Sequence, residues 1–123
     1  MILVDTSVWI DHLHRAESML GSLLQDADVC VHPMIVGELA LGTLRNRTVV
    51  LGLLAGLTDL PVANHREVLL LVEARSLHGR GLSLIDAHLL ASLLLSRTVA
   101  LWTRDRRLRS AAEDLGVAAS TLT

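Results

Sequence analysis

Two acidic side chains lie on predicted helical faces whose other residues are apolar. Asp86 has Leu90 and Leu93 four and seven residues further along, so its carboxylate shares an apolar stripe. The apolar residues on the same helical face as Glu38 are Met34, Ile35 and Leu41. An ionised carboxylate buried without a partner is so unfavourable that it is normally paired, neutralised or bound to a metal ion. Asp86 and Glu38 are therefore candidates for a functional site.

Two more acids follow predicted strands. Asp5 comes directly after the apolar run Ile2–Val4, and Asp105 follows the apolar run at 99–102. In open α/β sheets, ligands bind beyond the carboxyl ends of the strands, so one pocket could collect all four acids. Four carboxylates with no cysteine and no patterned histidine beside them form an oxygen-only site, which suits Mg²⁺ or Mn²⁺.

Each of these acids also has an alternative, purely structural role. Asp5 and Asp105 could cap the N-termini of the helices that follow them. Glu38 and Asp86 could each pair with a buried arginine. We favour one shared metal site because a single cause then accounts for all four positions.

The pattern of apolar residues predicts the elements that must position these acids. Apolar runs of strand length alternate with longer stretches of helical period, which predicts a three-layer α/β/α fold with a central parallel sheet. The predicted strands are Ile2–Val4, Val29–Val31, residues 99–102 and an edge strand at 60–63, where Pro61 cannot donate to a ladder. The predicted helices span residues 6–15, 17–24, 33–42, 48–57, 67–77, 83–96 and 106–115, the first capped by Thr6 or Ser7.

Length and composition predict one domain, residues 1–123, with an aliphatic core. Leucine supplies 28 residues, Phe and Tyr are absent, and Trp9 and Trp102 are expected in the core as its only bulky aromatic residues. All 11 basic side chains are arginines, which excludes mechanisms that need a lysine, such as Schiff-base chemistry. The lone Cys30 excludes an internal disulfide and is predicted to be a small buried hydrophobe.

No segment predicts secretion or membrane insertion. The apolar run before Asp5 is much shorter than the core of a secretory signal. The longest apolar stretch, residues 89–95, is far below the ~20 residues that cross a bilayer. We therefore expect a soluble, cytoplasmic protein.

Taken in order, the motifs resemble those of a PIN-domain ribonuclease. Within that family the chain is similar to the VapC toxins of bacterial toxin–antitoxin pairs, over essentially its whole length. The segments that carry the resemblance are Leu3-Val4-Asp5-Thr6-Ser7, Val36-Gly37-Glu38-Leu39-Ala40-Leu41-Gly42, Leu84-Ile85-Asp86-Ala87 and Leu101-Trp102-Thr103-Arg104-Asp105.

This resemblance implies a metal-dependent endoribonuclease that forms a homodimer and has a small VapB-like antitoxin as its partner. The implied metal site consists of Asp5, Glu38, Asp86 and Asp105, and the implied supporting hydroxyls are Thr6, Ser7 and Thr103. Many relatives carry a further Asp two places after the last acid, followed by Phe. This chain has Arg107 and Leu108 there, so the resemblance supports a first metal position and not a second.

Arginines cluster beside the last acid. Setting the four acids aside changes the net charge from −2 to +2, so the remaining surface is mildly basic. Guanidinium groups bind phosphate bidentately, and Arg104, Arg106 and Arg107 are therefore candidates for RNA-phosphate contacts. The alternative is a solvated helix face. The six histidines lack the spacing of a helix-borne metal pair and are interpreted as structural.

Two other functions compete with the ribonuclease hypothesis. A phosphohydrolase of the haloacid dehalogenase type also places an Asp after its first strand, but it needs a second Asp two residues on and a lysine. Here Ser7 stands at that position and the chain has no lysine. A catalytically silent PIN-like module that acts through a protein partner remains the alternative, and metal-dependent RNA cleavage would distinguish the two.

Overall fold

Four parallel strands form the centre of the molecule. The computed structural model describes residues 1–123. The strands are β1 (Ile2–Val4), β2 (Val29–Val31), β3 (Thr58–Asp59) and β4 (Ala100–Trp102), in the spatial order β3-β2-β1-β4. The register places Leu3 between Cys30 of β2 and Leu101 of β4. β1 and β4 thus end side by side, and the Asp5 amide donates to the Trp102 carbonyl at 2.9 Å.

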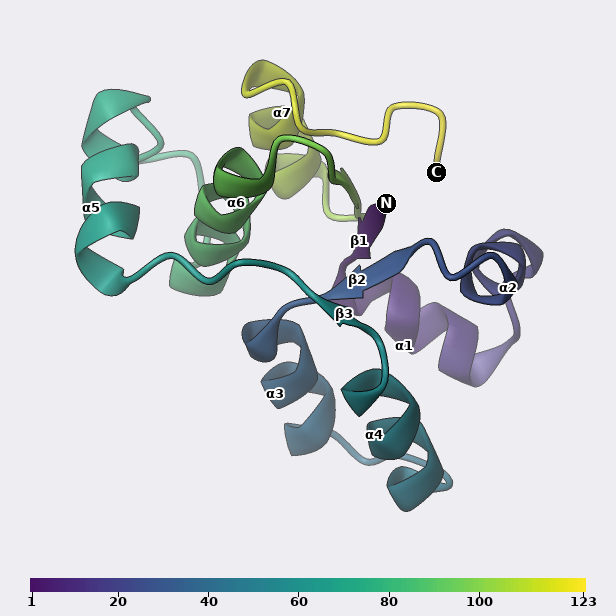
Figure 1. The fold of residues 1–123 in the computed structure, drawn as a ribbon. Helices are drawn as coiled ribbons and strands as arrows, with labels where there is room; N and C mark the ends of the chain where they lie inside the picture. Colours follow the sequence, from purple (N-terminus) through teal and green to yellow (C-terminus); the bar gives the residue numbers. More distant parts are fainter.

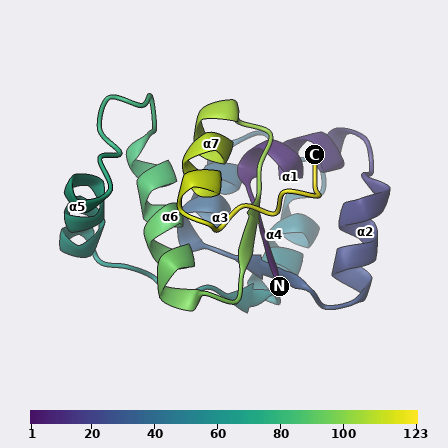
Figure 2. The ribbon, with the colours of Figure 1, turned by 90° about the horizontal axis from the view of Figure 1, so that it is seen from above.

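Helices cover both faces of this sheet. Figure 1 shows α1, α3 and α4 on one side of the strands and α6 and α7 on the other, and Figure 2 shows the same arrangement from above. The predicted three-layer fold is confirmed. No helix combines the length and the apolar character needed to cross a bilayer. The helices are α1 (Thr6–His14), α2 (Ser18–Gln25), α3 (Pro33–Leu41), α4 (Arg47–Ala55), α5 (His65–Ala74), α6 (Leu84–Ser96) and α7 (Arg106–Asp114).

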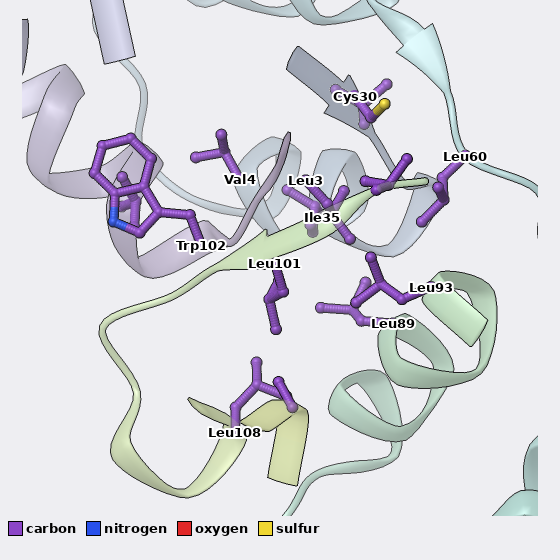
Figure 3. Close-up of a cluster of buried hydrophobic side chains, with 14 of the residues drawn as sticks. Leu3, Val4, Cys30, Ile35, Leu60, Leu89, Leu93, Leu101, Trp102 and Leu108 are labelled. Carbon is purple, nitrogen blue, oxygen red and sulfur yellow. The ribbon is translucent and has the colours of Figure 1, made fainter. Parts of the chain in front are cut away.

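The core is aliphatic, as the composition predicts. Leu89 and Leu93 of α6 and Leu108 of α7 pack beneath Leu101 of β4 (Figure 3), and all four are buried. Burying one such leucine contributes about 1.5–3 kcal/mol relative to leaving it exposed. The strands read as continuous apolar runs because helices cover both of their faces. Cys30, Trp9 and Trp102 are buried in the same core, as expected.

The predicted edge strand at 60–63 is wrong. The edge strand is β3 at Thr58–Asp59, and pairing continues only as far as the Leu60 amide, which donates to the Val31 carbonyl at 2.9 Å. The ladder stops there because β2 ends at Val31 and the chain enters α3 at Pro33. The helix predicted from residue 67 begins at His65 instead, because Asn64 and Glu67 form a capping box at its start.

A buried histidine caps the helix that carries Glu38. His32 lies at the N-cap of α3, and its Nδ1 accepts a hydrogen bond from the Met34 amide at 3.1 Å. The proton therefore sits on Nε2, which faces Ser92 Oγ on α6 at 3.0 Å. Burial lowers the pKa of His32 to about 4, and the nearby His88 acts in the same direction. The cap requires the neutral imidazole.

We expect the free energy of unfolding to decrease as the pH is lowered from 6.5 towards about 4. His32 binds a proton more readily in the unfolded chain than in the folded one, so protons favour unfolding in this window. Above pH 6.5, the pKa of histidine in the unfolded chain, neutral His32 contributes about 3 kcal/mol to the free energy of unfolding. This contribution is lost as the pH falls towards about 4, the pKa of His32 in the folded protein. Urea unfolding across this pH range measures the loss. His32→Asn, which keeps an acceptor for the cap but does not titrate, should show a flatter dependence, and equal slopes would contradict this origin.

Candidate active site

The four predicted acids are carried by four different elements. Asp5 and Asp105 follow the neighbouring strands β1 and β4 and occupy the N-cap positions of α1 and α7. Glu38 lies in the second half of α3, and Asp86 lies in the first turn of α6. Asp5 is buried, with 7% of its surface exposed, Glu38 and Asp86 are half-buried, and Asp105 is exposed.

Two hydroxyls orient Asp5 and connect it to the strand that precedes Asp105. Thr103 Oγ1, which is buried, donates to Asp5 Oδ2 at 2.7 Å and accepts from the Asp105 amide at 3.1 Å. Ser7 Oγ donates to the same Asp5 oxygen at 2.9 Å and accepts from the Arg104 amide at 3.1 Å. Each hydroxyl uses its one proton to donate to Asp5, so both hold this carboxylate oxygen in place.

The other two acids are each held by a neighbouring group. Thr6 Oγ1 donates to Glu38 Oε1 at 2.8 Å and so links α1 to α3. The Ser83 amide donates to Asp86 Oδ2 at 3.0 Å, and Ser83 Oγ accepts from the Asp86 amide at 3.0 Å. This reciprocal pair is a capping box, which the Ser83-x-x-Asp86 spacing would have indicated. The prediction that Thr6 or Ser7 caps α1 is wrong, since Asp5 occupies that position.

The charges of the acids are not balanced by arginine. None of the four takes part in any of the salt bridges of the structure, so the alternative of a buried arginine partner for Glu38 and Asp86 is wrong. Burial raises the pKa of Asp86, and the negative charges of Asp5 and Asp105 raise it further, against the hydrogen bonds from Ser83. Asp86 therefore lies within electrostatic reach of both strand-end acids.

One oxygen of each acid is held and the other is free. The held oxygens are Asp5 Oδ2, Glu38 Oε1, Asp86 Oδ2 and Asp105 Oδ1, the last accepting from the amides of Arg107 and Leu108. Asp105 thus also caps α7, whereas the Asp5 side chain makes no capping bond. In metal sites, hydrogen bonds to one carboxylate oxygen orient the other oxygen towards the metal ion.

The side chains do not stand in a coordinating arrangement. No three carboxylate, imidazole or thiol groups lie close enough together to hold a metal ion. Repulsion between the like charges of the site acts to keep them apart. The donor set still fits a hard cation, because it consists of carboxylate oxygens that are free on one side.

The apolar stripe predicted around Glu38 is buried only in part. Ile35 is fully buried, but Leu41 is 91% exposed and Met34 is also exposed. The reason is that α3 packs against the sheet through the face that carries Ile35 and Leu39, and the remainder of the helix faces outward. Glu38 instead stands in the wall of a groove of about 610 Å³, whose apolar lining consists of Ile10, Leu13, Leu39, Leu44 and Val50.

Arg104, predicted as an RNA contact, is engaged within the protein. Its Nη1 donates to Asp11 at 2.6 Å and to Glu17 at 2.8 Å, and its Nε donates to the Thr123 carbonyl at 3.0 Å. The guanidinium also lies over the Trp102 ring, 5.7 Å from its centre. Two carboxylates already balance its charge, so it is the least available of the three candidate arginines.

Arg106 and Arg107 have no carboxylate partner. The side chain of Arg106 makes no hydrogen bond, and that of Arg107 lies against the backbone of Gly81 in the loop before α6. In the sequence, Gly79-Arg80-Gly81 follows the predicted helix at 67–77 and is typical of a helix end. Nothing in that pattern indicates the contact, because it joins residues far apart in the chain.

Comparisons with known proteins agree with the fold. The PIN domain family model matches residues 2–114. The chain is 53% identical over 118 residues to Ribonuclease VapC32 from two strains of Mycobacterium tuberculosis, covering 96% of this chain and 95% of the relative. The crystal structure of PAE2754 from Pyrobaculum aerophilum superposes with a TM-score of 0.60, covering 93% of this chain and 90% of that one. At 20% identity, that likeness concerns the fold alone.

We expect Asp86→Asn to raise the melting temperature of the protein in EDTA at neutral pH. The pKa of Asp86 is raised, so its charged form is disfavoured in the fold, while Asn can still accept from the Ser83 amide. The gain should shrink as the pH falls and the wild-type carboxyl takes up its proton. Thermal unfolding measures both effects. Asp26→Asn, an exposed acid at the end of α2, is the control, and a large loss of stability in Asp86→Asn would contradict the unfavourable burial of the Asp86 charge.

Proposed function

The chain belongs to the PIN-domain family and, within it, to the VapC proteins, and on this premise we propose that it is an Mg²⁺- or Mn²⁺-dependent endoribonuclease and the toxin of a type II toxin–antitoxin pair. One observation carries the proposal. Asp5, Glu38, Asp86 and Asp105 are each fixed through one oxygen, free at the other, and unpaired with any arginine. Acids used only for helix capping would not need that arrangement at all four positions.

The four acids are the residues that would hold the ion. A divalent ion supplies activation of water and neutralisation of charge on the phosphate. Thr103 and Ser7 orient Asp5 by donating to its Oδ2, and Thr6 orients Glu38 in the same way. Asp86, whose pKa is raised, is the acid that gains most from a nearby cation.

The proposed reaction is hydrolysis of an RNA phosphodiester. The oxygen of a water molecule forms a bond to phosphorus, and the bond from phosphorus to the 3′ oxygen breaks on the opposite side. The products are a 5′-phosphate and a 3′-hydroxyl, which takes up the proton that the water releases. Arg106 and Arg107, which lack carboxylate partners, are the proposed contacts to the RNA phosphates, with Arg104 available only if it leaves Asp11 and Glu17.

A small antitoxin is the proposed protein partner, and a homodimer the proposed assembly. The groove beside Glu38 supports the first part, because its lining includes five apolar side chains beside an acid of the site. A segment with apolar side chains could cover this groove, and an arginine or lysine from it could enter among the carboxylates. Such a cation would compete with the metal ion. The similarity to VapC proteins supports both parts, and the cytoplasm is the compartment in which we expect them.

We expect the purified chain to cleave RNA in Mg²⁺ or Mn²⁺ and to lose this activity in EDTA. Asp5→Asn removes a ligand and should lower the cleavage rate at least about 100-fold. Cleavage of total bacterial RNA, followed on denaturing gels, measures the effect. Asp26→Asn is the control and should cleave like the wild type. Cleavage by Asp5→Asn at the wild-type rate would contradict the metal site, and no cleavage by the wild type would favour the silent binding module.

Expression of the chain alone should arrest the growth of a bacterial host, because an unrestrained ribonuclease degrades the host's RNA. Asp5→Asn should be harmless at the same expression level. Growth curves measure the difference, and co-expression with the cognate antitoxin should restore growth of the wild type. If the wild type cleaves RNA in vitro but leaves growth unchanged, it is a PIN-domain nuclease without a toxin role.

A further inference from the structure

Arg107 lies across the backbone of a glycine. Gly81 stands in the loop between α5 and α6 with φ +76°, in the left-handed region that favours glycine. A Cβ at Gly81 would lie 2.7 Å from Arg107 Nη1 and 2.8 Å from Arg107 Cδ. These atoms belong to the outer part of a flexible side chain, so any side chain at position 81 would displace the guanidinium rather than the backbone.

A second arginine joins the same loop to α7 in the opposite direction. Arg80 Nη2 donates to Asp114 Oδ2 at 2.8 Å and lies 3.4 Å from Ser110 Oγ. Arg80 reaches from the loop to α7, whereas Arg107 reaches from α7 to the loop. The charge of Arg80 is therefore balanced by Asp114, while Arg107 lies against Gly81 and has no acidic partner.

The loop and the helix start that Arg107 connects both lead into the candidate active site. Its own amide donates to Asp105 Oδ1 at 2.9 Å, in the first turn of α7. Gly81 lies two residues before Ser83, whose amide holds Asp86 at the start of α6. An uncompensated positive charge is thus placed beside the two helix ends that carry Asp86 and Asp105.

We propose that Gly81 and Arg107 form a unit that binds a backbone phosphate of the RNA at the edge of the acidic site. Arg107 is the binding contact, and Gly81 is a positioning residue that leaves room for the guanidinium. Four carboxylates repel a polyanion, and the guanidinium beside Gly81 offsets this repulsion where the strand must approach. The fork of the guanidinium matches two phosphate oxygens. This inference rests on the proposed ribonuclease function and identifies how its substrate is held.

The experiment measures binding of a short single-stranded RNA of mixed sequence to the full chain carrying Asp5→Asn, in EDTA, at several salt concentrations. Arg107→Gln should weaken binding several-fold and reduce the salt slope by about 0.7, the value for one lost phosphate contact on a single strand. Gly81→Ala should weaken binding in the same direction. Once Arg107→Gln is present, Gly81→Ala should have no further effect.

Gly79→Ala is the matched control. Gly79 has nearly the same backbone conformation, with φ +72°, and a Cβ added there would meet no atom within 4 Å, so the substitution strains the loop without touching Arg107. It should leave RNA binding unchanged, and thermal unfolding should show similar losses for both glycine variants. Equal losses of binding in Gly79→Ala and Gly81→Ala would overturn the role of Gly81.

A separate measurement distinguishes this inference from the proposed function. The same Arg107 and glycine substitutions are made in the otherwise wild-type chain, and RNA cleavage is measured in Mg²⁺. One outcome is that the wild type cleaves RNA while Arg107→Gln shows unchanged binding, salt slope and kcat/KM. This result would overturn only the Gly81–Arg107 unit, and Arg107 would then be a structural link. A wild-type chain that neither binds nor cleaves RNA would overturn the proposed function, and this inference with it.

Discussion

Parallel pairing of β1 with β4 brings together two acids that are a hundred residues apart in the chain. The Asp5 amide bonds to the Trp102 carbonyl, so both strands end at the same level of the sheet. Thr103 then bridges the two strand ends, donating to Asp5 and accepting from Asp105. Without this pairing Asp5 would lose its buried hydrogen-bond donor, and α1 and α7 would not begin side by side. The helices that carry Glu38 and Asp86 are placed by packing against the same sheet.

The proposed site contains negative charge that no arginine of the fold compensates. Arg104, Arg80 and Arg109 are each engaged with carboxylates elsewhere on the surface. The site acids keep hydroxyl and amide donors instead, which orient them without neutralising them. This arrangement costs stability, because burial and neighbouring charges raise the pKa of Asp86. Functional sites commonly carry such a cost, which a bound cation would remove.

Neutral polar contacts between elements fix the positions of the acids. His32 caps α3 and faces Ser92 on α6, so two of the acid-bearing helices are joined through one buried imidazole. Ser83 fixes Asp86 at the start of α6, and Thr6 fixes Glu38 from α1. The acids are therefore oriented by groups from neighbouring elements as well as by their own helices. A substitution of any of these groups would change the positions of the acids.

The sequence alone determined the layer architecture and most of the elements, because apolar periodicity is a local signal, and charges in apolar stripes or after strands marked the four acids as candidates. It misjudged the edge strand, since the extent of pairing depended on where the partner strand β2 ends and α3 begins. It also overestimated the burial around Glu38, since only packing decides which face of α3 meets the sheet. Only the tertiary structure showed that Arg104 is engaged by Asp11 and Glu17 while Arg107 rests on Gly81. Long flexible side chains reach partners across the fold, and no spacing along the chain encodes those partners.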